Sequence, residues 1–224
     1  MRLEAFVEPW TGLSRIRGVE EAGSVERVTV FSRVVAGLCW PKGTTPGAVV
    51  ALAEELEADP LEGYRTLRLV DLIQEADVER LLGLAAEAAP LAGKWAGRSA
   101  VSAWVGDPQH VYAKRLRFLN ERLRAEGRPP LRLRPAPGLG AGGQLHADLA
   151  PYLTARIVGR SALVLGRQEL VAMIEDAGKD IRRPIEDFPA VAALMWAIAH
   201  CDERKPALGR AQTRSGVADG RAGY

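Results

Sequence analysis

Three aspartates stand beside predicted secondary-structure elements, where carboxylates from different parts of the chain can act together. Asp107 follows the apolar run at 100–105, Asp71 ends a segment of alternating polar and apolar residues, and Asp187 precedes a strongly apolar segment. Carboxylates from separate elements are the ligands with which proteins hold pairs of Mg²⁺ or Mn²⁺ ions, which activate water and polarise phosphates. These residue types allow a metal site for phosphodiester cleavage built from Asp71, Asp107 and Asp187, with Asp107 as the first candidate ligand.

Asp107 also has an interpretation that needs no metal. It is followed by Pro108 at the start of a predicted helix, and an aspartate before such a proline is a favoured N-cap. The segment 28–53, where the central strand would supply a partner carboxylate, contains no Asp or Glu. The N-cap role and the metal-ligand role both stay open, and the N-cap role requires no partner.

A second candidate for chemistry is a basic segment that could contact phosphates. Between residues 114 and 134 it has eight bases and two acids, Glu121 and Glu126, which leaves a local charge of 8 − 2 = +6. Its bases are Lys114, Arg115, Arg117, Arg122, Arg124, Arg128, Arg132 and Arg134. Such a patch predicts salt-sensitive binding of nucleic acid. A solvated helix face stabilised by ion pairs four residues apart explains the same pattern.

Other reactive residue types lack the spacing that their chemistry requires. Cys39 and Cys201 show no CxxC pattern, and His110, His146 and His200 show no zinc-ligand spacing. The glycine-rich segment 138–143 lacks the Lys-Ser/Thr ending of a phosphate-binding loop, and no serine lies in a G-x-S-x-G motif. We therefore expect no zinc site, no P-loop and no serine triad.

The elements that must position these side chains are a meander of strands followed by alternating helices and strands. Apolar runs and alternation predict strands at 28–40, 48–54, 64–71, 100–105 and 131–134. Helical spacing predicts helices at 78–89, 109–125, 168–175 and 189–200, the last of them mostly buried.

Length and composition predict one domain with extensions at both ends. The 224 residues, 47% of them hydrophobic, suffice for one sizeable core, and 30 basic residues nearly balance 28 acidic ones. We expect an N-terminal arm at 1–27, irregular or with a short helix, a domain at 28–201, and a disordered tail at 202–224. No signal peptide and no membrane span is evident, so we expect a soluble, cytoplasmic protein.

This order of elements resembles the ribonuclease H-like fold, an α/β fold with a mixed sheet ordered 3-2-1-4-5 and helices on both faces. Within that class the chain resembles the C-terminal nuclease domain of phage large terminase subunits. The residues that carry the resemblance are Val35-Ala-Gly-Leu-Cys-Trp40, Trp104-Val-Gly-Asp-Pro108 and Phe188-Pro-Ala-Val-Ala-Ala-Leu-Met-Trp-Ala-Ile198.

The resemblance implies a metal site that has lost most of its ligands. In that family Mg²⁺ or Mn²⁺ is held by an aspartate on the first strand, an acid after the fourth and an aspartate in a late helix. The matching positions here are Cys39, Asp107 and, in the helix, Ala192. One carboxylate of three remains, so no cofactor is expected unless Asp71, Asp107 and Asp187 form a rearranged site for Mg²⁺ or Mn²⁺.

The preferred hypothesis is a phage- or prophage-type ribonuclease H-like domain without catalysis, acting in nucleic-acid binding or in packaging and assembly. Its expected partners are DNA and other phage proteins, with no membrane. Two alternatives are an active metal-dependent endonuclease with displaced carboxylates and an α/β scaffold that binds proteins.

Overall fold

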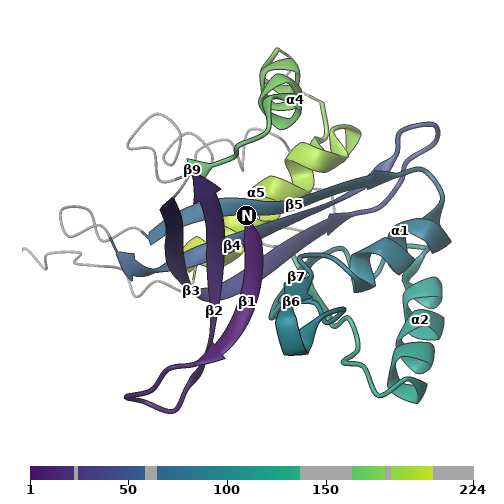
Figure 1. The fold of residues 1–224 in the computed structure, drawn as a ribbon. Coiled ribbons are helices and arrows are strands. Elements are labelled where there is room, and N and C mark those ends of the chain that lie inside the picture. The colour runs from purple at the N-terminus through teal and green to yellow at the C-terminus, as the bar shows by residue number, and fades with distance from the viewer. Residues whose placement is uncertain (23–24, 59–64, 137–162, 180–182, 204–224) are drawn as a thin grey trace, which may run out of the picture.

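A long strand, β3 (Val25–Cys39), organises the structure because different parts of it pair with different neighbours. The computed structural model describes residues 1–22, 25–58, 65–136, 163–179 and 183–203 (Figure 1). The first part of β3 pairs with β2 (Ser14–Ala22), and the second part lies between β4 (Gly47–Ala58) and β7 (Ala103–Gly106). β4 is antiparallel to β3, whereas β7 is parallel to it.

The sheet around β3 has the strand order that the ribonuclease H-like resemblance implies. β5 (Arg65–Glu75) pairs antiparallel with β4, and β8 (Leu133–Pro135) pairs parallel with β7. The resulting path is β5-β4-β3-β7-β8, which is 3-2-1-4-5 when these five strands are counted from β3. A two-residue strand, β9 (Leu163–Val164), lies beyond β5.

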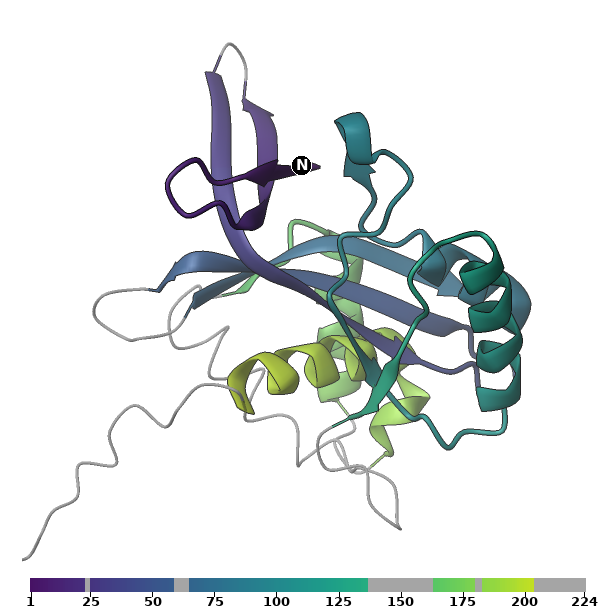
Figure 2. The ribbon, with the colours of Figure 1, turned by 90° about the horizontal axis from the view of Figure 1, so that it is seen from below.

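The N-terminal segment forms strands, which the sequence did not predict. β1 (Arg2–Val7) and β2 make a hairpin that pairs with the first part of β3, and β6 (Leu91–Ala92) pairs with β1. Figure 2 shows this hairpin standing away from the main layer of the sheet. β3 begins at Val25, earlier than predicted, and its first part offers unpaired backbone groups that β2 satisfies. The predicted arm at 1–27 is thus β-structure where it is described, and the predicted tail lies outside the described residues from 204 onward.

Helices cover both faces of the sheet, as predicted. Alternation along β3 sends Val35 and Cys39 toward α5 (Pro189–Glu203), which is buried almost throughout. α4 (Gln168–Gly178) packs on the same side as α5. Val34, Ala36 and Leu38 point the opposite way, toward α1 (Val78–Ala86) and α2 (Ala113–Ala125). Two 3₁₀ turns, η1 (Gly93–Trp95) and η2 (Ile185–Asp187), complete the described elements.

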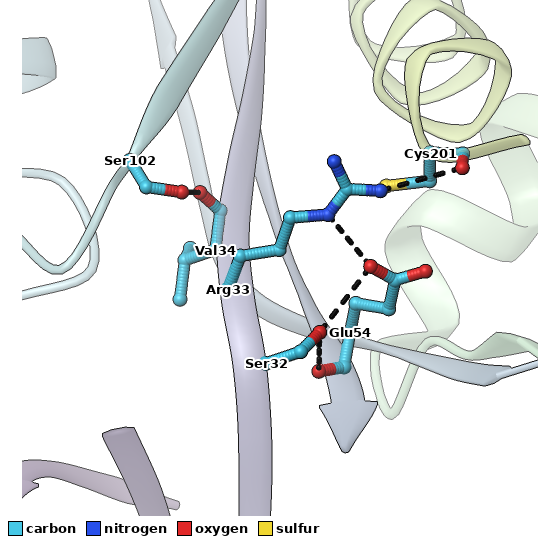
Figure 3. Close-up of polar contacts among 6 residues, drawn as sticks. All are labelled: Ser32, Arg33, Val34, Glu54, Ser102 and Cys201. Carbon is cyan, nitrogen blue, oxygen red and sulfur yellow. Dashed lines mark hydrogen bonds and ion pairs between the residues drawn. The ribbon is translucent and has the colours of Figure 1, made fainter. Parts of the chain in front are cut away.

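A buried ion pair holds the end of α5 against the sheet (Figure 3). Register shifts between Phe31 and Arg33 in β3, and Arg33 Nε donates to Glu54 Oε2 at 2.6 Å. The same guanidinium donates from Nη2 to the Cys201 carbonyl oxygen at 3.3 Å. Ser32 Oγ adds a bond to Glu54 Oε2 at 3.3 Å, and only 2% of Glu54 is exposed. These hydrogen bonds therefore connect β3 with β4 and with the C-terminal end of α5.

Gly37 allows the backbone of α5 to approach β3 closely. A Cβ atom at this position would overlap the carbonyl oxygen of Ala193, a backbone atom that cannot move without shifting the helix. Gly106 is similar, because its Cβ would overlap the carbonyl oxygen of Leu38 on β3. These two close approaches fix how α5 and β7 lie on the central strand.

We predict that Gly37→Ala lowers the free energy of unfolding by about 1–3 kcal/mol, because the added methyl group forces α5 away from the sheet. Gly83→Ala is the matched control: in α1 its Cβ would meet nothing within 4 Å, so it should raise stability by about 0.5–1 kcal/mol. Urea unfolding followed by circular dichroism measures both. Equal changes in the two variants would contradict the close packing at Gly37.

Candidate functional site

The parallel strands β3 and β7 end side by side and bring Cys39 close to Asp107. Leu38 pairs with Gly106, so the residues that follow them, Cys39 and Asp107, lie at the same edge of the sheet. A small cavity of about 70 Å³ lies there, and its lining consists of Cys39, Trp40, Lys42, Asp107, His110, Glu186 and Trp196. This is the position at which the resemblance implies a metal site.

Asp107 is held in a turn that precedes α2. Its Oδ1 accepts a hydrogen bond from the backbone N–H of Gln109 at 2.8 Å, and its carbonyl oxygen accepts one from Trp40 Nε1 at 2.9 Å. α2 begins only at Ala113, with Tyr112 as its N-cap. The prediction that Asp107 is the N-cap of this helix was therefore wrong, because Asp107 instead stabilises a local turn through its hydrogen bond with Gln109.

Cys39 supplies a neutral thiol where a carboxylate would be needed. Burial raises the pKa of this thiol far above its ordinary value, and the negative charges of Glu186 and Asp107 raise it further, while Lys42 acts in the opposite direction. A protonated thiol is a poor ligand for Mg²⁺ or Mn²⁺, which prefer oxygen donors.

Asp187 is engaged by two cations. Lys42 Nζ lies 2.5 Å from Asp187 Oδ1, and Arg183 Nε lies 3.2 Å from Oδ2. The hydrogen bond from Lys42 lowers the pKa of Asp187 below its usual range, and Arg183 adds to this effect. The carboxylate is ionised, but its charge is already balanced by the protein.

Asp71 lies in a different part of the molecule. Its Oδ2 accepts a hydrogen bond from the backbone N–H of Ala89 at 2.9 Å, and Ala89 has a positive φ of 49°. Asp71 lines a separate cavity with Met1 and Leu3 from the N-terminal strand. Its contacts indicate a structural role in the turn after α1, and the structure does not bring it together with Asp107 and Asp187.

These residues do not fit a divalent metal ion. Asp107 and Glu186 are the two carboxylates that line the cavity, and the ammonium group of Lys42 lines it with them. In the part of the chain that the structure describes, no three His, Cys, Asp or Glu side chains are grouped so that they could hold a metal. The helix position matched to the third ligand, Ala192, is fully buried in the core. We therefore derive no catalytic step through a metal.

Sequence reasoning missed Lys42 and the aromatic cluster beside it. The rings of Trp40 and His110 are stacked, with centroids 5.6 Å apart and planes at 13°, and Tyr112 lies 5.0 Å from His110. Burial lowers the pKa of His110, while the charge of Asp107 acts to raise it. The only signal for Lys42 was its position two residues after a buried strand.

The basic segment is exposed along α2 and the turn into β8, with Arg128 half-buried. Some of its charges are paired: Arg115 with Glu79 at 3.1 Å, and Arg122 and Arg128 with Glu126 at 3.9 and 3.5 Å. Elsewhere, the predicted loop at 138–143 and His146 lie outside the described residues. Among the helices that are described, none has the length and apolar character needed to cross a membrane.

The strand path β5-β4-β3-β7-β8 with helices on both faces defines a mixed α/β domain with the ribonuclease H strand order. Among solved structures the chain resembles the large terminase nuclease domain from bacteriophage SPP1 with bound Mn, an example of the ribonuclease H-like fold. The TM-score is 0.41 at 15% sequence identity, and the match covers 76% of this chain and 88% of that chain. No family model matches the chain, and no curated protein does.

We predict that Asp107→Asn lowers the pKa of His110 further, because the carboxylate charge that favours the protonated imidazole is removed. A pH titration of the histidine Cε1 proton signals by NMR measures this, with the signal assigned by its loss in His110→Gln. Asp71→Asn is the control and should leave the His110 midpoint unchanged. A midpoint that rises or stays constant in Asp107→Asn would show that the two groups do not interact.

Proposed function

We propose that this protein is a nucleic-acid-binding domain of ribonuclease H-like topology, acting in phage DNA packaging or assembly without metal-dependent cleavage. The observation that carries the proposal is the surplus of positive charge along α2 and the turn into β8. Its natural partner is a polyanion, and DNA is the one that the resemblance implies.

The basic segment keeps a surplus of positive charge when its ion-paired bases are left out. Lys114, Arg117, Arg124, Arg132 and Arg134 have no carboxylate within ion-pairing distance among the described residues. All five are exposed, so their charges act on solvent and on any approaching polyanion. This favours phosphate binding over the alternative of a helix face whose charges are satisfied internally.

The composition of the strand-end cavity supports the part of the proposal that excludes cleavage. A neutral thiol and a lysine ammonium lie beside Asp107, and cations of the chain already neutralise Asp187. The rival of an active endonuclease rests on Asp107 and Glu186, which line the same cavity. The rival of a protein-binding scaffold predicts no affinity for DNA at any salt concentration.

We predict that the protein binds a 20-base-pair duplex at low salt and that its affinity falls by about a hundredfold between 50 and 200 mM salt, as four phosphate contacts imply. Fluorescence anisotropy of a labelled duplex measures this. No detectable binding at 50 mM salt would contradict the proposed function and favour the scaffold.

A further inference from the structure

A groove of about 670 Å³ lies at the starts of β7 and β8, at the far end of β7 from Asp107. Its lining comes from the segments 96–99, 101–104 and 126–132, together with Ala86 and Arg134. The strand-end cavity and this groove are separate sites on the same sheet, and only the groove is large enough to admit a chain of nucleotides.

Four arginines line this groove, and they come from two distant parts of the sequence. Arg128, Arg132 and Arg134 belong to the basic segment, whereas Arg98 comes from the loop after η1. Among the described lining residues Glu126 is the only acid, so the local charge is 4 − 1 = +3. Arg98, Arg132 and Arg134 have no carboxylate partner within the described ranges.

The arginines are placed by the structure around them. Leu131 and Leu133 pack against the core, whereas Arg132 and Arg134 are exposed and line the groove. Asn120 of α2 fixes the start of this segment with two hydrogen bonds, donating to the Leu131 carbonyl at 2.9 Å and accepting from its N–H at 2.7 Å. The guanidinium of Arg98 lies 4.8 Å from the centroid of the Trp95 ring, and Arg98 also lines the groove.

The groove offers contacts to phosphates rather than to bases. Among its described lining residues the only aromatic one is Trp104, which is 6% exposed and cannot serve as a stacking platform. Arginines suit phosphate oxygens because the planar guanidinium donates two parallel hydrogen bonds. A ligand held in this way is bound through its backbone and independently of its sequence.

We propose that this groove is the nucleic-acid site: it binds the sugar-phosphate backbone through Arg98, Arg132 and Arg134, at the end of β7 opposite to the strand-end cavity. This rests on the proposed function and specifies where the nucleic acid lies. It assigns phosphate contacts to Arg98, which lies outside the basic segment, and it leaves the outward charges of α2 with a weaker, long-range attraction for the polyanion.

Two triple variants with the same change in net charge test this assignment. The groove variant is Arg98→Gln, Arg132→Gln and Arg134→Gln, and the helix variant is Lys114→Gln, Arg117→Gln and Arg124→Gln. All six residues are exposed, so both variants should keep the wild-type circular dichroism spectrum and melting temperature. Arg98→Gln alone provides a milder second test.

Binding is measured by anisotropy with two 20-base-pair duplexes of unrelated sequence, as a function of salt. The groove variant should lose at least about tenfold in affinity at 50 mM salt and flatten the slope of log K against log salt by about 2.7. The helix variant removes charges that attract DNA from outside the groove, so it should lose less affinity than the groove variant does. Arg98→Gln should weaken binding by itself, and both duplexes should bind alike.

An equal or larger loss in the helix variant, or an unchanged affinity in Arg98→Gln, would overturn the groove assignment and leave the proposed function intact. A clear preference for one duplex would overturn backbone recognition. No binding by the wild-type protein would instead contradict the proposed function itself.

Discussion

The parallel pairing of β3 with β7 is the constraint on which the rest of the structure depends. It requires Gly106, because a side chain there would overlap the Leu38 carbonyl, and it sets Cys39 beside Asp107 at one edge of the sheet. The close contact of α5 at Gly37 then covers the same strand from the other side. The ends of β3 and β7 therefore lie side by side, whatever side chains they present.

Those side chains make the edge stable without a metal. Lys42 and Arg183 both bind Asp187, and Cys39 stays neutral through burial. Lysine and arginine cations and a neutral thiol do not supply the several oxygen ligands that Mg²⁺ or Mn²⁺ needs. The proposed binding site is separate from this edge, since the arginine groove lies at the other end of β7.

The five strands of the main sheet and the buried last helix were predictable, because alternation and continuous apolar runs depend on burial alone, whereas their order in the sheet came from the resemblance. The hairpin at 2–22 was not predictable. Its glycines and Pro9 interrupt the alternation typical of strands, and its formation depends on pairing with the first part of β3. The sequence placed the start of α2 too early, because Pro108 favours the first turn of a helix. In the structure the residues after Asp107 form a separate turn, and α2 begins at Ala113. Lys42 and Arg98 gained their roles only through contacts with residues far away in the sequence.

The central claim is that the strand ends do not support metal-dependent cleavage. Incubation of the protein with supercoiled plasmid over a Mn²⁺ titration, followed by gel electrophoresis, tests it directly, with Asp107→Ala alongside. The account predicts that the plasmid stays supercoiled at every Mn²⁺ concentration and that the two proteins behave alike. Nicking that increases with Mn²⁺ in the wild-type protein and disappears in Asp107→Ala would contradict it.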